Sequence, residues 1–425
     1  MAEVSTDCHL TSIGSFAPGM VVYVEAVPSG LTNVDGATEA AAKRLFKDQL
    51  DRCLIGVSDP RVQGRCDHSL FDIVAVTLMA VMCGAEDFTD IEEFGLRRED
   101  WLRSFLDLPS GIPSHDTFER VLGLLQRDQF AACLFEWTKA IHEATGSGKA
   151  GEVIAIDGKA LRRSLKKKSG LGMLHLVTAW SSANGLTLGQ VTCEEKSNEI
   201  TAIPKLLELL NVKGATVTID AMGTQTAIAE QIRHQKGHYV LALKGNQSGL
   251  AEDMKALFDD GTAVDFEGFA HDEYSVTEKG HGRVDERACH VIEIPKDHPQ
   301  RSKWKDLRTL AVTISCRTVG EKETWESRYY ISSLGPKAKP LAEAIRRHWS
   351  IENSQHWVLD VAFGEDWRRQ QDRNGAANIA AVRRLAVSLL RQEKTNKRGA
   401  KCKRMCCALD PNYLLTVLHT ANFDA

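Results

Sequence analysis

The 425-residue sequence lacks features that mark exported and membrane proteins. Its longest apolar run, Phe71 to Ala85, contains Asp72 and is shorter than the roughly 20 residues that a bilayer span requires. No lysine or arginine precedes Lys43, so the N-terminus has no basic region of the kind that begins a signal peptide. These absences predict a cytoplasmic protein with no membrane partner.

Paired metal-binding cysteines and an excess of positive charge are also missing. The 11 cysteines are scattered, and the cluster Cys402, Cys406 and Cys407 lacks the C-x-x-C spacing of a structural zinc site. Without an export signal they are expected to be reduced thiols. The net charge is -4, so any polyanionic partner must be inferred from local lysine and arginine clusters, which a chain average hides.

The composition that remains, 43% hydrophobic and 26% charged, is that of a globular protein with more than one core. Residues 1–40 are small and polar without periodicity, which predicts a loosely ordered extension. Helical periodicity predicts an all-α domain over 41–145. The glycine-rich segment 146–151 predicts a hinge, and it is no nucleotide-binding loop, because Ala150 follows Lys149 where serine or threonine is required.

One helix of the N-terminal domain leaves two interpretations open. It begins after Ser114, and Phe118, Val121, Leu122 and Leu125 follow the spacing of a single apolar face. The pattern fits a helix-turn-helix unit that reads DNA. It fits equally well a small bundle that only packs on the next domain, because periodicity alone does not identify a recognition helix.

Residues 152–392 alternate between strand and helix patterns. A strand through Asp157 precedes two further strands, a helix near 199–210, a strand that ends at Asp220 and another over 239–243. This order predicts an α/β protein whose mixed sheet has an RNase H-like fold. Residues from about 245 to 335 read mostly as strands and predict a β-rich insertion, and 393–425 are predicted to be a basic tail.

Two aspartates follow short apolar strands, Asp157 after 153–156 and Asp220 after 217–219. The carboxyl ends of parallel strands meet at one edge of a sheet, with neighbouring strands roughly 4.8 Å apart. If the two strands are neighbours, the carboxylates repel each other and a divalent cation removes the repulsion. A lone aspartate after a strand is more often a turn or helix cap, so this pattern by itself does not establish a site.

A third acid lies on a predicted helix. At helical spacing, Glu352 shares one face with His348 and His356, so the acid is expected to point into the protein. Three carboxylates are a sufficient set for magnesium, and two such ions can activate the attacking oxygen and stabilise the leaving one at phosphorus. A zinc site of His348, Glu352 and His356 is an alternative, although the H-E-x-x-H spacing is absent.

These segments resemble the H-repeat-associated group of bacterial insertion-sequence transposases, and the motifs occur in the order and spacing of that family. The motifs in the second half are Ile156-Asp157-Gly158-Lys159 with Arg162 and Ser164, Lys196-Ser197-Asn198-Glu199-Ile200, Ile219-Asp220-Ala221-Met222-Gly223-Thr224-Gln225, Leu243-Lys244-Gly245-Asn246-Gln247, His348-Trp349-Ser350-Ile351-Glu352-Asn353, His356-Trp357, Leu359-Asp360 and Phe363-Gly364-Glu365-Asp366. Upstream, Gly64-Arg65, His68, Gly84-Ala85 and 113–118 resemble the domain that accompanies it. The resemblance covers about residues 45–392.

The resemblance implies a DDE-type transposase that cuts DNA at the ends of its element and joins them to target DNA. It implies Asp157, Asp220 and Glu352 as catalytic residues and metal ligands, with two Mg²⁺ ions for which Mn²⁺ can substitute. A homodimer is expected to hold the element ends, at the nucleoid when on DNA. One departure is that broader relatives carry a tyrosine, arginine, glutamate and lysine signature around the last acid, whereas here the positions four before and seven after Glu352 are His348 and Leu359.

The expected DNA contacts lie near these motifs: Arg162, Arg163, Lys244, Asn246, Gln247, His348, Asn353 and His356. Basic residues that follow each acid, Lys166 to Lys168 and Arg368, Arg369, Arg373, Arg383 and Arg384, are further candidates for phosphate binding. The six basic residues from Lys394 to Arg404 are expected to add sequence-independent attraction. Trp325 leaves two interpretations open, stacking on an unpaired base or a place in the core, which is the commoner position for a tryptophan. Alternative functions are a nuclease that does not join DNA and a silent DNA-binding derivative.

Overall fold

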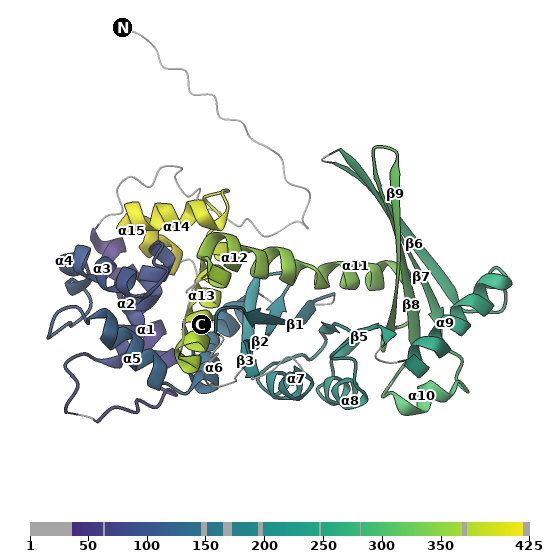
Figure 1. Ribbon diagram of the computed structural model, residues 1–425, viewed down its shortest axis with the longest axis horizontal. Coiled ribbons are helices and arrows are strands. Elements are labelled where there is room, and N and C mark those ends of the chain that lie inside the picture. Colours follow the sequence, from purple (N-terminus) through teal and green to yellow (C-terminus); the bar gives the residue numbers. More distant parts are fainter. Residues whose placement is uncertain are drawn as a thin grey trace, which may run out of the picture.

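The structure, a computed structural model, describes residues 36–62, 64–145, 151–164, 172–193, 199–245, 248–280, 282–367 and 372–419. Figure 1 shows most helices gathered at one end, a sheet in the middle and long strands rising at the other end. Most of the predicted extension and of the predicted hinge lies outside the described residues. Within the described part, no helix has both the length and the apolar composition needed to cross a membrane.

A nine-stranded mixed sheet forms the centre of the fold, in the order β3-β2-β1-β4-β5-β9-β8-β7-β6. The first three strands are antiparallel, β4 and β5 run parallel to β1, and β9 pairs antiparallel with β5. This confirms the predicted RNase H-like α/β sheet. The strands are β1 (Val153–Leu161), β2 (Leu174–Ser181), β3 (Leu186–Cys193), β4 (Thr216–Ile219), β5 (His238–Leu243), β6 (His271–Gly280), β7 (Arg283–Glu293), β8 (Thr309–Val319) and β9 (Lys322–Ser332).

The β-rich segment continues this sheet, because β9 pairs with β5 in the register Val240↔Ser332. It also contains two helices that strand patterns did not predict, α9 (Ser248–Ala263) and α10 (Pro299–Lys303). The signal for α9 was present in the sequence. Leu250, Met254 and Leu257 recur at helical spacing, and all three are buried.

Helices cover both faces of the sheet, as the alternation of side chains along β1 requires. Ile154 and Ile156 lie in the main core with residues of α7 (Glu199–Glu208), whereas Val153 packs in a second core with Leu341. Figure 1 shows α7 and α8 (Thr226–His234) on one side of the sheet. On the other side lie α11 (Ala338–His348) and α12 (Trp357–Phe363).

The 20-residue helix α13 (Arg373–Gln392) joins the helical end of the molecule to the sheet. It contacts three helices of the N-terminal region as well as β2 and β3, so both parts share one core. The packing is that of a bundle resting on the following domain. Its helices are α1 (Gly36–Leu54), α2 (Leu70–Cys83), α3 (Phe88–Arg97), α4 (Glu99–Arg103), α5 (His115–Leu124) and α6 (Arg127–Ala144). Ser69 caps the start of α2, Asp87 that of α3 and Ser114 that of α5, each through its side chain.

The segment after residue 392, predicted to be a basic tail, is folded in its described part, and Lys394, Lys397, Arg398 and Lys401 remain exposed. Residues there form α14 (Ala400–Leu409) and α15 (Pro411–His419), which pack on α2 and α1. Lys403 and Arg404 are buried, and the Arg404 guanidinium donates hydrogen bonds to the Val81 carbonyl near the end of α2. Apolar residues of α15 outweigh the local charge, because their burial requires the segment to fold back.

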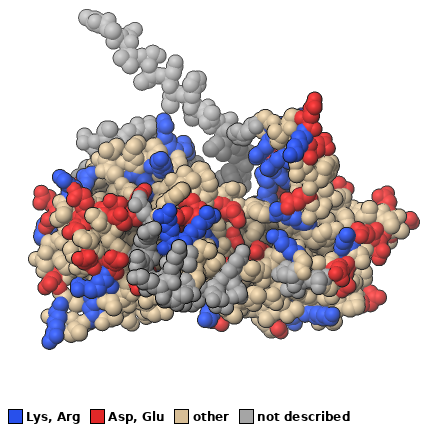
Figure 2. Space-filling model, viewed as in Figure 1, with Lys and Arg blue, Asp and Glu red and all other residues tan. Residues whose placement is uncertain are grey.

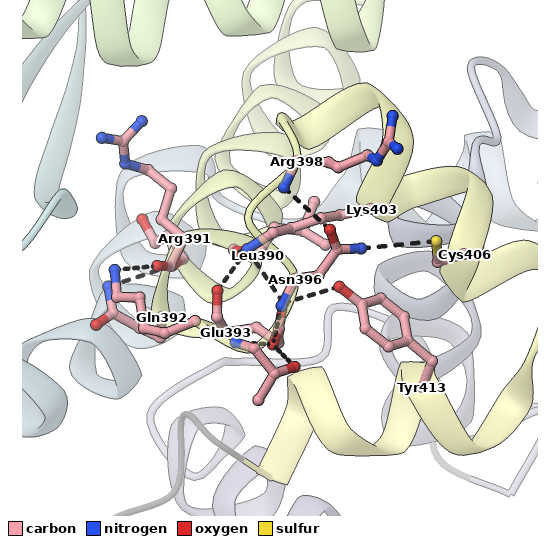
Figure 3. A network of polar contacts seen from close by, with 12 residues as sticks. Leu390, Arg391, Gln392, Glu393, Asn396, Arg398, Lys403, Cys406 and Tyr413 are labelled. Carbon is pink, nitrogen blue, oxygen red and sulfur yellow. Dashed lines mark hydrogen bonds and ion pairs between the residues drawn. The ribbon is translucent and has the colours of Figure 1, made fainter. Parts of the chain in front are cut away.

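A buried carboxylate organises the turn between α13 and α14 (Figure 3). Glu393 is fully buried and accepts hydrogen bonds from Thr395, Asn396 and the Tyr413 hydroxyl, and the Lys403 ammonium lies 3.1 Å from its Oε2. Burial alone would raise the pKa of Glu393, but these donors overcome that effect and lower the pKa to about 2. The charged form of Glu393 therefore holds the C-terminal helices in place.

We expect Glu393→Ala to lower the free energy of unfolding by about 3 kcal/mol, because it leaves Lys403 buried without its counter-charge. The wild-type advantage should be complete above pH 4.5 and decline toward pH 2, since the folded state releases this proton more readily than the unfolded state. Urea unfolding at several pH values measures both effects. Glu252→Ala, an exposed glutamate on α9, is the control, and equal stability of the two variants would contradict the prediction.

Candidate active site at the ends of β1 and β4

Two aspartates lie side by side because β1 and β4 are parallel neighbours. Their ladder ends with the pair Ile156↔Ile219, so Asp157 and Asp220 are the next residue on each strand. One expectation requires correction, since β1 does not end at Asp157. It continues to Leu161 because its other neighbour, β2, pairs with it beyond that point, with Asp157 opposite Thr178. The backbone of Asp157 is therefore held by β2 on one side, while on the other side its pairing with β4 has already ended.

Asp220 also has the structural role of a turn residue. Its Oδ1 accepts hydrogen bonds from the backbone N–H groups of Met222 and Gly223, at 3.1 and 3.2 Å. A Cβ on Gly223 would lie 2.3 Å from Ile219 Cγ2, so this tight turn excludes larger residues. The turn fixes the carboxylate at the end of β4.

Glu352 begins a π-helical turn, η4 (Glu352–His356), between α11 and α12. An unbroken α-helix was predicted, with Glu352 buried. In the structure Glu352 is exposed, while Gln355 and His356 are buried, because the wider turn changes which side chains face the sheet. Ligand atoms of Asp157, Glu352 and His356 nevertheless lie within 4.8 Å of one another. Among the described residues, neither His348 nor Asp220 is in this group, so the alternative zinc set is not assembled and Asp220 stands slightly apart at the end of β4.

The π-turn is anchored by Gln355, which was not among the predicted site residues. The Thr178 hydroxyl donates to Gln355 Oε1 at 3.2 Å, and Gln355 Nε2 donates to the Thr187 hydroxyl at 2.6 Å. These contacts join the turn to β2 and β3. No periodic signal could have identified Gln355, because its burial depends on the irregular turn.

Burial and like charge perturb the titration of the site. Burial is the main cause that raises the pKa of Asp157 to about 7, and the charges of Glu352 and Asp220 add to it, against a hydrogen bond from the Gly158 N–H. Burial lowers the pKa of His356 to about 3. His356 is therefore neutral at pH 7, so the 3.7 Å between its Nδ1 and Asp157 Oδ2 is not a charged pair.

The donor set fits a divalent cation. Carboxylates concentrated at one point repel each other, and His356 Nε2 is buried without a hydrogen-bond partner in the described part of the chain.

His348 lies outside this donor set. Its pKa is lowered to about 4 by burial, and its Nδ1 lies 3.0 Å from the Thr218 hydroxyl on β4.

The remaining predicted DNA contacts fall into three groups. Lys244 is exposed beyond β5 and lines a cavity with Asp220, and Asn353 is exposed while its side-chain amide donates to the Trp349 carbonyl at 3.3 Å. Arg162 lies 3.0 Å from Asp366, and the Arg163 guanidinium lies 5.8 Å from the Trp367 ring centre. Asn246 and Gln247 lie outside the described residues, as do Lys166 to Lys168, Arg368 and Arg369.

Three arginines after the glutamate helix were predicted to hold phosphates, and for these the structure requires a correction. Arg373, Arg383 and Arg384 are all buried in α13. Arg384 is fully buried and forms a two-point ion pair with Glu365, at 2.9 and 3.4 Å. Arg383 donates to the Glu86 carbonyl at 2.9 Å. These charges hold α13 to its neighbours and do not reach solvent.

Lys159 links β1, the strand of Asp157, to α12, the helix that follows Glu352. It lies on the same face of β1 as Asp157, and its Nζ is 2.8 Å from Asp360 Oδ1 on α12 and 3.6 Å from Asp366 Oδ1. The side chain is only 9% exposed, so the pair is screened little by solvent. The contact sets the position of α12, and hence of Glu352, relative to β1.

Aspartates that follow neighbouring parallel strands, with a glutamate from a helical turn close to the first of them, are the arrangement expected of an RNase H-like protein. Sequence comparison agrees with this class. The chain belongs to the family of transposase DDE domains, which it matches over residues 148–389, and residues 52–138 match the domain described as DDE_Tnp_1-associated. The resemblance seen in the sequence is thereby confirmed.

Two similar relatives are bacterial. The protein named "Putative transposase YncI" of Escherichia coli O157:H7 is 42% identical over 85% of this chain and 92% of its own length. The protein named "H repeat-associated putative transposase YhhI" of Escherichia coli strain K12 is 39% identical over 85% and 95%. Among solved structures, a piggyBac transposase synaptic complex with hairpin DNA aligns with a TM-score of 0.40 and 11% identity, over 89% of this chain and 79% of that chain.

We expect Asp157 to make the metal-free protein less stable as pH rises from 5 to 8. The unfolded chain loses this proton near pH 3.8 and the folded chain near 7, so the folded state binds more protons in that interval. Relative to Asp157→Asn, wild type should lose about 2 kcal/mol of unfolding free energy over this range. Chelator-treated protein in urea provides the measurement, and Mg²⁺ should reduce the difference. A difference independent of pH would show that the carboxyl is not perturbed.

Lys159→Met should destabilise the protein by about 3 kcal/mol, because Asp360 then loses its cation and Asp366 keeps only the exposed Arg162. Adding Asp360→Asn should recover part of this loss, and the double-mutant cycle measures the coupling between the two side chains. Additive effects of the two substitutions would contradict a direct interaction.

Proposed function

We propose that this protein is an active DNA transposase that cleaves the ends of its own insertion sequence and transfers them into target DNA. The observation that carries the proposal is the closeness of Asp157, Glu352 and His356, whose ligand atoms lie within 4.8 Å of one another, with Asp220 at the end of the neighbouring strand β4. Membership in the transposase DDE family supports the same reaction class. A purely structural role does not account for acids placed where burial, and after it like charge, raises the pKa of a carboxyl.

The side chains have different parts in this proposal. Asp157 and Asp220, held by the β1–β4 ladder, face the phosphodiester, and Glu352 closes the site from the exposed side of η4. His356, neutral and buried behind Asp157, completes the donor set. Divalent ions, proposed as two Mg²⁺, would be held by these residues and when bound would stabilise the charge that develops on phosphorus and on the attacking and leaving oxygens. Lys244 and Arg162 are proposed to contact the DNA backbone beside the cut.

The reaction requires two element ends to be held together, so we propose that two copies of the protein act on DNA. The terminal inverted repeats of the element, found in the DNA that flanks the gene, are the proposed binding sites. Two alternative functions, a nuclease that does not join DNA and a silent binding protein, would have the same acidic residues. They would differ from a transposase only in the products formed from DNA. Assays of cleavage and of joining separate the three functions.

We expect Asp157→Asn, Asp220→Asn and Glu352→Gln each to reduce cleavage of a duplex carrying the inverted repeat by at least about a hundredfold. Binding of the same duplex should change little, because these side chains contact the reacting phosphate and few others. Gel electrophoresis of end-labelled DNA measures cleavage and joining, and fluorescence anisotropy measures binding.

Glu230→Gln, an exposed glutamate on α8 across the sheet, is the matched control and should retain full activity. Cleavage retained by any one of the three acid variants would remove that residue from the mechanism. Cleavage without joining by wild type would favour the nuclease. Binding without cleavage, with Mg²⁺ and Mn²⁺ both supplied, would favour the silent derivative.

A further inference from the structure

A cavity next to Asp220 adjoins a larger cleft. The cavity has a volume of about 240 Å³ and lies between the ends of β4 and β5, the strand β9 and the helix α11, with Lys244 and His348 in its wall. The cleft, of about 780 Å³, lies between the insertion strands and α11. Arg328, Tyr330 and Trp349 are among the residues that line both. The cavity at Asp220 and the cleft are therefore neighbours, with these three side chains between or beside them.

The indole ring of Trp349 lines both the cavity and the cleft. Trp349 follows directly after α11, and 40% of its surface is exposed. The Arg328 guanidinium, from β9, lies 4.4 Å from the centre of the indole ring. Trp349 is three positions before Glu352 in the chain, and it lines the same cavity as Asp220.

Trp325, for which the sequence left base stacking open, does not face the cleft. The cleft is lined by Thr324, Glu326, Arg328 and Tyr330, which are alternate residues of β9. Successive side chains of a strand point to opposite faces, so Trp325 points away from the cleft. It is 64% exposed on the outer surface of the insertion. Trp349 is the tryptophan that lines the cavity containing Asp220.

Charge argues against a simple phosphate channel in the cleft. Figure 2 shows lysine and arginine side chains on the inner side of the raised insertion strands. Acidic partners neutralise many of them: Arg287 lies 2.7 Å from Glu278, Arg317 lies 2.7 Å from Asp285, and Arg328 lies 2.8 Å from Glu326. An attraction for phosphates is therefore weak here, whereas stacking on the indole and the guanidinium does not require net charge.

We propose that Trp349, supported by Arg328, binds an unpaired nucleobase of the DNA strand that leaves the acidic site. The proposal rests on the proposed function, and it adds that the substrate is locally single-stranded next to the cut. A cavity of about 240 Å³ admits a base but not a duplex. Aromatic side chains and arginine planes are the usual stacking partners of unpaired bases, and they bind any sequence because every base has a π-face.

The test compares two probes on the full-length protein in Ca²⁺ buffer: a blunt duplex, and the same duplex with a short single-stranded extension that carries 2-aminopurine. We expect wild type to prefer the extended probe and to quench the 2-aminopurine. Trp349→Ala should weaken binding of the extended probe by roughly tenfold and abolish the quenching, without a comparable change for the blunt probe. Trp349→Phe, which keeps an aromatic ring, should restore most of both.

Trp325→Ala is the matched control, since it removes a more exposed tryptophan of the insertion from the opposite face, and it should behave as wild type. Arg328→Ala should reproduce a smaller part of the Trp349→Ala effect, and thermal unfolding verifies that each variant is folded. Equal binding of both probes by wild type, or an equal loss on both probes in Trp349→Ala, would overturn the proposal. Because Asp157→Asn should keep the preference, this result is independent of whether the protein cleaves DNA.

Discussion

The parallel pairing of β1 with β4 is the constraint on which the candidate site depends. It places Asp157 and Asp220 one strand spacing apart, a closeness that two carboxylates would not adopt unaided. The apolar residues before each aspartate supply the free energy that maintains it. Ile154, Ile156, Val217 and Ile219 are buried in the main core, so separating the acids would expose these side chains to water.

The third acid is positioned by buried polar contacts, which are directional in a way that apolar packing is not. Gln355 joins the π-turn to β2 and β3, Lys159 holds α12 against β1, and the ion pair of Arg384 with Glu365 joins the segment after α12 to α13. Buried charges are expensive to desolvate, and removing one partner leaves the other uncompensated. Such a network therefore has few alternative arrangements, which suits a site that must hold Glu352 near Asp157 from an exposed turn.

Basic residues serve two purposes in this chain, and their numbers alone do not separate them. Arg383, Arg384, Lys403 and Arg404 are buried and bind carbonyl or carboxylate oxygens of neighbouring elements. Arg162 and Lys244 remain exposed close to the acids. A chain with a net charge of -4 can thus present local positive charge near its site while using other cations as internal links. The weakly charged insertion cleft fits stacking of bases better than attraction of phosphates.

The sequence by itself predicted the succession of strands and helices from residue 153 to 243, the helix that begins after Ser114, and aspartates at the carboxyl ends of two apolar strands, because apolar periodicity, capping chemistry and motif spacing are local properties. Tertiary structure alone decided that β1 continues past Asp157, since only β2 can supply that pairing, and that the C-terminal segment folds back on α1 and α2. It also decided the π-turn at Glu352 and which tryptophan borders the site. These features depend on contacts between segments far apart in the chain, and neither periodicity nor charge counts contain them.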